Sequence, residues 1–340
     1  MSIKLGVIGA GRIGRLHAEN LVRYVRDTEV VAVADIVEEA ARRCAEDLGI
    51  PRALADYRPI LEDETVDAVL ICTSTDTHAE IIRAAAAAGK HIFCEKPLAL
   101  DLAEIDAALA AVEEAGVILQ VGFHRRFDPN FRRLKELLER GAIGRPWLLK
   151  ITSYDPAPPP ISYIRVSGGI FLDMTIHDFD MARYLLGEVE EVYAAGSVLV
   201  DPAIGDAGDV DTAVVILRFT DGALGVITNC RKAVYGHDQR IEVLGEKGAL
   251  FAENPCPHTA VRVDSEGYHS PPLHHFFVER YREAYIAEME AFVEAVREGK
   301  KPPVTGMDGK VPVVIGYAAQ RSHEEGRPVK LTEVDPSLSA

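Results

Sequence analysis

Residues 4–14 read Lys4-Leu5-Gly6-Val7-Ile8-Gly9-Ala10-Gly11-Arg12-Ile13-Gly14, an apolar strand that runs directly into the pattern Gly-x-Gly-x-x-Gly. Each glycine of this pattern has its own task at a strand-to-helix turn. Gly9 permits a tight turn, Gly11 leaves room for a phosphate against the backbone, and Gly14 lets the following helix pack closely. The helix that starts near Arg12 directs free N–H groups and its positive dipole end at that phosphate. The stretch therefore predicts a dinucleotide-binding turn.

A second apolar strand, residues 30–34, ends in Asp35, about where a carboxylate hydrogen-bonds the hydroxyls of an adenosine ribose. A carboxylate there repels a 2′-phosphate, and the next residues, Ile36 and Val37, supply no cation to hold one. These features favour NAD over NADP as the cofactor. The candidate cofactor-binding residues lie in the glycine turn or at the end of a following strand: Gly9, Gly11, Arg12, Ile13, Gly14, Asp35, Thr73, Ser74, Thr75, His78, Glu95 and Lys96.

Length and composition limit the class of protein. A chain of 340 residues predicts about two domains. The net charge of −16 argues against nucleic acid or an anionic membrane as a partner. The five cysteines show no Cys-x-x-Cys spacing, which favours buried free thiols. We expect a cytoplasmic protein, because the sequence shows no signal peptide and no apolar run near the ~20 residues that span a bilayer.

The first 123 residues alternate between strand and helix patterns, which predicts a parallel sheet covered on both faces. We expect this part, residues 1–123, to be an NAD-binding Rossmann domain. Asp101, followed by Glu104, predicts the start of its fourth helix. The strands are expected at residues 3–9, 30–35, 67–73, 90–94 and 117–121, and the helices at about 12–26, 37–48, 77–88 and 101–115.

Strand patterns dominate the rest of the chain, which predicts an α+β domain with an open, mainly antiparallel sheet over residues 124–340. Thr-Asp-Gly at 220–222 indicates a hairpin. An open sheet face needs a cover, so we expect a homo-oligomer, a dimer or a homotetramer, through this sheet. The last long helix, about 306–322, is a candidate to pack back on the first domain. Strands are expected at 146–154, 190–200, 212–220, 222–230, 239–245 and 248–252, and helices at about 128–140, 170–186, 277–298 and 306–322.

Polar residues follow two strands of the predicted parallel sheet, at the edge where such sheets bind ligands. Thr73, Ser74 and Thr75 can hold phosphate or ribose, or can serve only to cap the next helix. Lys96 follows another strand and precedes Pro97, in a peptide bond that is either cis or trans. Lys96 is either a residue of the nicotinamide end of the site or an ordinary surface lysine.

Asp173 and His177 are four residues apart in an apolar stretch, which predicts that they share one face of a helix. The pair is either a structural hydrogen bond or a catalytic dyad, whereas Asp178 and Asp180 are interpreted as helix-surface charges. Together with a dinucleotide site and Lys96, the pair suits oxidation of a secondary alcohol. His177 would take the hydroxyl proton, and Lys96 would stabilise the developing negative charge on that oxygen. Asp173 would orient His177 or bind a neighbouring substrate hydroxyl.

These residues together resemble the glucose–fructose oxidoreductase/inositol dehydrogenase family, and the resemblance covers essentially the whole chain. It is carried by the glycine pattern, by Glu95-Lys96-Pro97, by residues 122–128 (Gly-Phe-His-Arg-Arg-Phe-Asp), by 168–178 and by 305–309 (Thr-Gly-Met-Asp-Gly). The resemblance implies that Lys96, Asp173 and His177 are the catalytic set. It also implies that the second domain binds substrate and mediates oligomers.

Within the family, residues 155–160, 167–180 and 235–240 look like those of the inositol 2-dehydrogenases. This likeness implies that myo-inositol or a close cyclitol is oxidised to the inosose. Two residues depart from the expected pattern: Tyr154 stands where a basic residue is expected, and His237 replaces an aromatic. The candidate substrate-binding residues are Lys96, Arg126, Asp155, Tyr163, Asp173, His177 and Tyr235.

Other functions remain as alternatives on the same scaffold. One is a dehydrogenase of another polyol or sugar, such as scyllo-inositol or an aldose. Another is a hydrolase that uses NAD for transient oxidation, and a third is a non-catalytic NAD sensor. The chain contains no Tyr-x-x-x-Lys pair, which excludes the short-chain dehydrogenase mechanism, and we expect no metal site because His274-His275 lacks partners at ligand spacing.

Overall fold

The computed structural model describes residues 2–338, and within them the chain forms two compact units. The first unit consists of the chain up to Phe127 together with Glu283–Val311, and the second of Asp128–Arg282 together with the chain from Pro312 onward. The first boundary lies close to the expected one at residue 123. The return of residues 283–311 to the first unit was not expected from the sequence.

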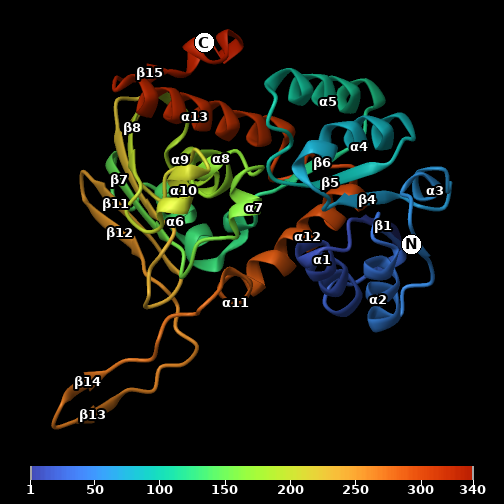
Figure 1. The fold of residues 1–340 in the computed structure, drawn as a ribbon, viewed down its shortest axis with the longest axis horizontal. Helices are drawn as coiled ribbons and strands as arrows, with labels where there is room; N and C mark the ends of the chain where they lie inside the picture. The colour runs from blue at the N-terminus through green and yellow to red at the C-terminus, as the bar shows by residue number, and fades with distance from the viewer. Residues whose placement is uncertain (1, 339–340) are drawn as a thin grey trace. The chain divides into compact units, whose positions relative to one another are not determined.

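The first unit is built on a six-stranded sheet in the order β3-β2-β1-β4-β5-β6, in which every neighbouring pair is parallel (Figure 1). This confirms the predicted Rossmann sheet. Its strands are β1 (Ile3–Ile8), β2 (Thr28–Ala34), β3 (Ala53–Leu54), β4 (Ala68–Ile71), β5 (His91–Glu95) and β6 (Leu119–Gly122). Its helices include α1 (Arg12–Arg23), α2 (Glu38–Leu48), α3 (Arg58–Leu61), α4 (Thr75–Ala87) and α5 (Leu102–Ala115), and η1 (His124–Phe127) is a 3-10 turn.

The ends of the helices follow local chemistry that the sequence displays. Asp101 precedes α5, and its carboxylate accepts hydrogen bonds from the N–H groups of Ala103 and Glu104, as predicted. Gly116 ends the same helix in the left-handed conformation, with φ of 63°. These two residues fix the length of α5 and therefore the point at which the chain enters β6.

Helix α12 (Arg282–Glu298) covers the sheet of the first unit, although it lies far along the chain. Met289 and Phe292 belong to the buried core that also contains Phe93 of β5, and the rings of Phe93 and Phe292 lie 5.8 Å apart. The side-chain amide of Gln120 donates a hydrogen bond to the backbone carbonyl of Glu288. The sequence shows an apolar face on this helix but does not show which sheet that face covers.

The second unit contains a seven-stranded sheet in the order β12-β11-β7-β10-β9-β8-β15. The pair β7 and β10 is parallel and the other neighbours are antiparallel, which confirms an open, mainly antiparallel sheet. The predicted hairpin joins β9 to β10 through Gly222, whose φ is 89°. The strands are β7 (Pro146–Tyr154), β8 (Val189–Ser197), β9 (Thr212–Phe219), β10 (Leu224–Cys230), β11 (Asp238–Gly245), β12 (Gly248–Ala252) and β15 (Val329–Lys330).

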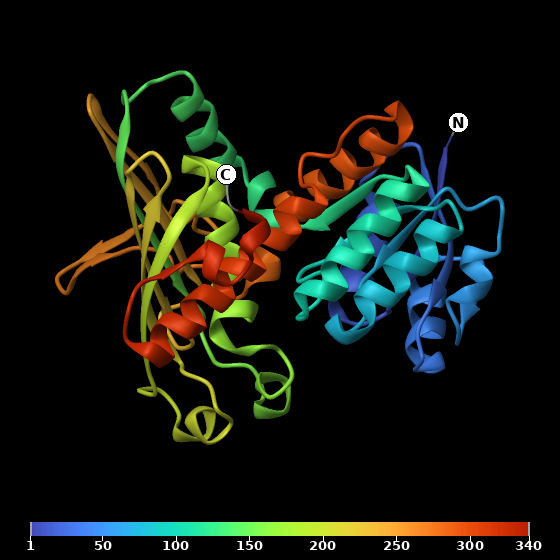
Figure 2. The ribbon, with the colours of Figure 1, turned by 90° about the horizontal axis from the view of Figure 1, so that it is seen from above.

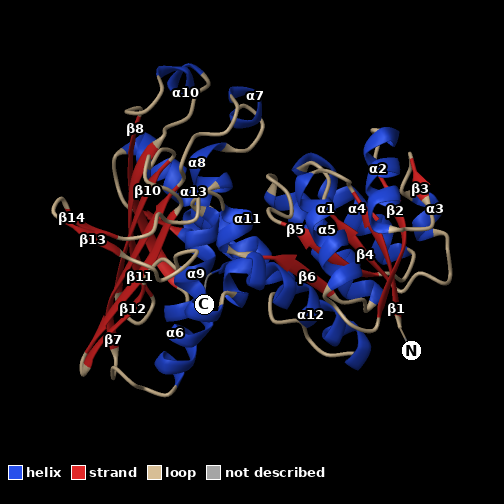
Figure 3. Ribbon diagram, turned by 90° about the horizontal axis from the view of Figure 1, so that it is seen from below, coloured by secondary structure: helices blue, strands red, loops and turns tan. Residues whose placement is uncertain are grey.

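The helices of this unit lie on one face of its sheet (Figures 2 and 3). They include α6 (Pro129–Glu139), α8 (Gly169–Asp173), α9 (Ile176–Leu186) and the part of α13 (Gly306–Glu325) from Pro312 onward. A short hairpin of β13 (Arg262–Asp264) and β14 (Gly267–His269) projects from the same unit (Figure 1). The remaining elements are α7 (Ile161–Ile164), α10 (Pro202–Asp206), α11 (Phe277–Arg280), η2 (Leu331–Glu333) and η3 (Pro336–Leu338).

The expected helix over residues 170–186 is broken, so Asp173 and His177 do not share one continuous helix. Asp173 ends α8 and His177 lies in the first turn of α9. At the break, the carbonyl oxygen of Ile170 accepts the backbone N–H groups of both Met174 and Thr175, and the hydroxyl of Thr175 donates to the same oxygen. The prediction of one continuous helix over these residues was therefore wrong.

Asp178 and Asp180 are fully buried, so their interpretation as surface charges was wrong. The side-chain amide of Asn229, on β10, donates to the Asp178 carboxylate at 2.7 Å. A buried carboxylate needs such a donor because burial without one is costly. The sequence does not show this contact, since the two residues are about fifty positions apart. Within residues 2–338, none of the helices is both long enough and apolar enough to cross a bilayer.

Replacement of Phe292 by Ala is expected to lower the free energy of unfolding of the first unit by about 3–5 kcal/mol, because it leaves a cavity in the core beneath β5. Denaturant unfolding followed by circular dichroism measures the change. The matched control is Glu294→Ala on the exposed face of the same helix, which is expected to change stability by less than about 0.5 kcal/mol. Equal effects of the two substitutions would contradict the placement of α12 in this core.

Candidate active site

The glycine turn between β1 and α1 is held by close backbone approaches. Gly9 has φ of 99°, and a Cβ on it would lie 2.5 Å from the carbonyl oxygen of Cys72. A Cβ on Gly14 would lie 1.8 Å from the carbonyl oxygen of Gly9. By contrast, the position of a Cβ on Gly11 is open, with nothing within 4 Å. Gly9 and Gly14 therefore shape the turn itself, and Gly11 leaves the free space that a pyrophosphate needs beside the first N–H groups of α1.

Asp35, which follows β2, is tied directly to this turn. One of its carboxylate oxygens accepts the N–H of Ala10 at 2.7 Å, and the other accepts the N–H of Val37 at 2.8 Å. Ile36 beside it is 89 % exposed, so the immediate surroundings on this side are apolar and open. The carboxylate thus lies at the glycine turn, where it can meet the ribose of a bound dinucleotide.

The polar residues after β4 begin helix α4. Ser74 occupies the N-cap position, but its side chain makes no capping hydrogen bond there, so capping alone does not explain its presence. The hydroxyl of Thr77 donates to that of Thr73 at 2.7 Å. His78 is buried, with Nε2 3.1 Å from the carbonyl oxygen of Thr73 and Nδ1 2.8 Å from that of Pro97. Burial lowers the pKa of His78, and in its neutral form the ring can donate to only one of these two carbonyl oxygens.

Glu95 and Lys96 lie at the carboxyl end of β5, and the Lys96–Pro97 peptide bond is cis. The Glu95 carboxylate accepts the N–H of Lys96 at 3.3 Å and contacts Nε2 of His17 at 2.7 Å. His17 was missed by the sequence analysis. Its position on the same face of α1 as Gly14, Ala18 and Leu21, which are all buried, could have indicated it.

The thiols beside these strand ends are not reactive groups. Burial raises the pKa of both Cys72 and Cys94 well above the usual range of a thiol, so both stay protonated. Both cysteines are free, as expected, and so are Cys44, Cys230 and Cys256, but the expectation of a buried thiol is wrong for Cys256, which is exposed.

In the second unit, Asp173 is the centre of a cluster of polar side chains. The hydroxyl of Tyr163 donates to one carboxylate oxygen of Asp173 at 2.9 Å, and Nη1 of Arg231 donates to the other at 3.2 Å. Nη2 of Arg231 reaches Asp209 at 3.3 Å. Arg231 is only 1 % exposed, so its positive charge is balanced by these two carboxylates. Arg231 and Asp209 were both missed, because nothing in their local sequence marks them.

The other substrate candidates have different hydrogen-bond or ion-pair partners. Asp155 lies 3.2 Å from Nδ1 of the buried His237. His237, which departs from the expected family pattern, therefore forms an acid–imidazole pair with Asp155. The hydroxyl of Tyr235 donates to Asp238, and burial together with this bond raises the pKa of Tyr235 to about 12. Tyr235 therefore stays protonated at neutral pH. Arg126 belongs to the first unit, where it pairs with Asp308 at 3.0 Å.

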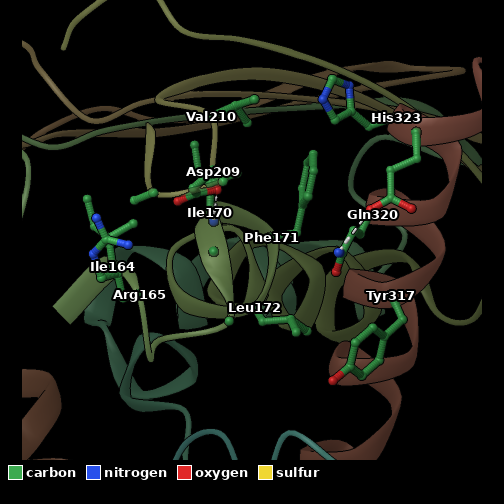
Figure 4. Close-up of a pocket in the computed structure, with 15 residues that line it drawn as sticks. Ile164, Arg165, Ile170, Phe171, Leu172, Asp209, Val210, Tyr317, Gln320 and His323 are labelled. Carbon is green, nitrogen blue, oxygen red and sulfur yellow. Dashed lines mark hydrogen bonds between the residues drawn. The ribbon is translucent and has the colours of Figure 1, made fainter. Parts of the chain in front are cut away.

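A pocket of about 430 Å³ opens around the start of α8 in the second unit (Figure 4). Asp209 lies against the N–H of Ile170 there, at 2.9 Å, and Gln320 and His323 of α13 line the far side (Figure 4). None of the catalytic candidates lines this pocket. It therefore does not mark the site of the chemistry predicted from the sequence.

Comparison with known proteins agrees with the geometry of the glycine turn. Residues 3–123 match the model of an oxidoreductase family with an NAD-binding Rossmann fold (GFO_IDH_MocA), and residues 131–251 match the C-terminal domain model of the same family. The chain belongs to this family of NAD-binding oxidoreductases. The glycine turn, the free space at Gly11 and the carboxylate of Asp35 all fit NAD.

Three relatives show how far the similarity extends. The chain is 56 % identical to the myo-inositol 2-dehydrogenase of Thermotoga maritima, over 98 % of this chain and 99 % of the relative. It is 47 % identical to the inositol 2-dehydrogenase of Rhizobium meliloti, over 97 % of this chain and 100 % of the relative. The scyllo-inositol dehydrogenase of Lactobacillus casei, whose structure contains NAD(H) and scyllo-inositol, superimposes with a TM-score of 0.92 at 30 % identity, over 98 % of this chain and 100 % of that chain.

Replacement of Asp35 by Asn is expected to weaken NADH binding about tenfold, the equivalent of about 1.4 kcal/mol, and to narrow the difference between NADH and NADPH. The amide keeps an oxygen for the turn but removes the charge that repels a 2′-phosphate. Fluorescence titration with each coenzyme measures both affinities. Glu38→Gln, which removes a neighbouring exposed charge, is the control and should change neither affinity. Equal affinity of the unmodified protein for NADH and NADPH would overturn the role of Asp35.

Proposed function

We propose that this protein is a dehydrogenase that oxidises a secondary hydroxyl of myo-inositol, or of a close cyclitol, to the inosose with NAD. The observation that carries the proposal is the full-length 56 % identity to a relative named myo-inositol 2-dehydrogenase. The geometry of the NAD turn and the polar cluster around Asp173 support it.

In this proposal, Lys96, Asp173 and His177 are the catalytic residues. NAD supplies the acceptor for the hydride that leaves the carbinol carbon. His177 acts as general base and takes the proton of the reacting hydroxyl. The Lys96 ammonium hydrogen-bonds the same oxygen and stabilises the negative charge that develops on it.

Asp173 has two candidate roles, orienting His177 and binding a substrate hydroxyl. Tyr163 and Arg231 already donate to its two oxygens, so its carboxylate is held in place. A carboxylate with two such donors is suited to accept a hydrogen bond from a substrate hydroxyl through its remaining lone pairs. We therefore propose that Asp173 binds substrate as well as orienting His177.

The main alternative is scyllo-inositol, which differs from myo-inositol in the orientation of one hydroxyl. The observation in its favour is that the scyllo-inositol dehydrogenase of Lactobacillus casei shares this fold over the whole chain. The pair formed by Asp155 and His237 is a candidate to discriminate between such isomers, because the partly exposed Asp155 carboxylate is backed by the buried imidazole.

Addition of myo-inositol and NAD to the purified protein is expected to raise the absorbance of NADH. A panel that contains myo-inositol, scyllo-inositol and several aldoses then ranks the substrates by kcat/KM. If NADH forms only with scyllo-inositol or an aldose, that compound replaces myo-inositol as the proposed substrate, and the assignment as a dehydrogenase stands. No rise with any member of the panel would exclude the dehydrogenase proposal.

Lys96→Ala and His177→Ala are each expected to lower kcat by about 10²–10⁴-fold while NADH affinity changes little, because both residues act at the reacting oxygen. Steady-state kinetics and NADH titration separate the two effects. Lys300→Ala and His258→Ala, at exposed positions, are the controls. Normal turnover of either active-site variant would remove that residue from the mechanism.

We also propose that a second copy of the chain covers the open face of the second unit's sheet. An open sheet face normally carries polar residues, but this face exposes Trp147, Tyr193, Ile216, Leu244 and Phe251. The register places Tyr193 beside Ile216, and Ile216 beside Val226, so the apolar side chains form a continuous row across three strands. A patch of this kind is typical of a subunit interface.

Ile216→Glu is expected to convert the oligomer, a dimer or a tetramer, into smaller species, because it places charges within the interface. Light scattering coupled to size-exclusion chromatography measures the mass. Val22→Glu, at an exposed apolar position on α1, is the control and should leave the mass unchanged. A monomeric unmodified protein would exclude the proposal.

A further inference from the structure

A buried imidazole joins the helix of the glycine turn to the strand end that carries Lys96. His17 of α1 is fully buried, and its Nε2 lies 2.7 Å from Oε1 of Glu95. The ring packs edge-on against Phe93 and Tyr285, with centroid distances of 5.0 Å and 5.7 Å. Packing on these sides leaves the ring little freedom to rotate away from Glu95.

The carboxylate that His17 contacts is itself confined. Its other oxygen, Oε2, accepts the backbone N–H of Lys96 at 3.3 Å. A Cβ on Gly122 of β6 would lie 3.0 Å from the carboxyl carbon of Glu95, so a side chain there would press on the carboxylate. Glu95 therefore transmits the position of His17 to the backbone of Lys96.

The same ligand atoms could be considered for a metal ion, because His17, Glu95 and Glu288 each place one within 4.8 Å of the others. The 2.7 Å separation between Nε2 of His17 and Oε1 of Glu95 is too short for two ligands of one metal ion. Two ligands on one tetrahedral zinc, each about 2.0 Å from the metal, would lie about 3.3 Å apart. The distance is that of a hydrogen bond to a charged acceptor.

The residue after Lys96 is held from the opposite side. His78 of α4 contacts the carbonyl oxygen of Pro97 through Nδ1 at 2.8 Å, and that of Thr73 through Nε2 at 3.1 Å. Lys96 thus lies between the Glu95 carboxylate, which His17 of α1 contacts, and the carbonyl of Pro97, which His78 of α4 contacts. Its own backbone has little freedom to shift along the end of the sheet.

We propose that His17 is a positioning residue, which acts through Glu95 to fix Lys96 relative to the glycine turn. The inference rests on the proposed function, because Lys96 must meet a substrate beside the nicotinamide while α1 holds the pyrophosphate. One hydrogen bond then links the element that binds the coenzyme to the element that carries the catalytic lysine. A displacement of about 1 Å at a catalytic group can lower the rate by about 10²-fold, so a contact that fixes the position of Lys96 matters for catalysis.

Kinetics of three variants test the role. His17→Leu is expected to lower kcat by about 10- to 100-fold while KM for NAD and for the substrate changes by less than about threefold. His17→Gln keeps an N–H donor and is expected to recover most of kcat. His91→Leu removes an imidazole from the opposite end of the same strand and is the matched control, expected to keep kcat. A normal kcat for His17→Leu, or no recovery by His17→Gln, would overturn the proposal.

Loss of His17 removes the partner of Oε1 of Glu95, and an unpaired carboxylate oxygen costs stability. The double variant His17→Leu/Glu95→Gln removes that charge and is expected to recover the melting temperature but not kcat. Recovery of both would show that stability alone explained the loss, and would overturn the positioning role.

Hydrogen exchange provides a measurement that does not depend on activity. Amide exchange of residues 91–100 is expected to be faster in His17→Leu than in the unmodified protein or in His17→Gln. Unchanged exchange would overturn the proposal whether or not the protein turns over an inositol. If the unmodified protein oxidises no cyclitol but exchange still rises, the positioning by His17 stands and the proposed function fails.

Discussion

The first unit depends on how closely two pieces of backbone approach each other at the glycine turn. The carbonyl oxygen of Gly9 lies where a Cβ on Gly14 would be. In the same way, the carbonyl oxygen of Cys72 leaves no room for a Cβ on Gly9. This approach brings α1 against the ends of β1 and β4, so the first N–H groups of α1 face the edge where the strands end. His17 can reach Glu95 only because α1 lies this close to the sheet. The NAD turn and the setting of Lys96 are therefore consequences of one packing constraint.

Much of the first unit could be predicted because its signals are local. The glycine pattern, Asp101 and the alternation of apolar strands with helices each act within a few residues of the structure that they determine. The place of α12 could not be predicted, because its apolar face is complementary to more than one surface. Phe292 and Met289 show only that the helix covers a core, and the structure shows that this core lies beneath β5.

The second unit shows the same limit at the candidate site. The sequence predicted one helix that carries both Asp173 and His177, but the structure divides it into α8 and α9, and the two residues lie on different helices. Arg231 could not be found from its neighbours in the chain. Its significance comes from charge balance, since a guanidinium that is 1 % exposed requires carboxylates, and Asp173 and Asp209 supply them. Contacts between residues about twenty to sixty positions apart have no signature in a single sequence.

Asp35 illustrates why coenzyme preference in this fold is more than a choice of charge. Its two oxygens accept the N–H groups of Ala10, in the glycine turn, and Val37, at the start of α2. The carboxylate that would bind the ribose hydroxyls is thus also a structural acceptor for the turn that would bind the pyrophosphate. A substitution that removes it to admit a 2′-phosphate leaves the N–H of Ala10 without its acceptor, and the turn loses part of its support. A change to NADP therefore requires a new cation for the phosphate and, separately, a new acceptor for Ala10, which a single substitution at Asp35 cannot supply together.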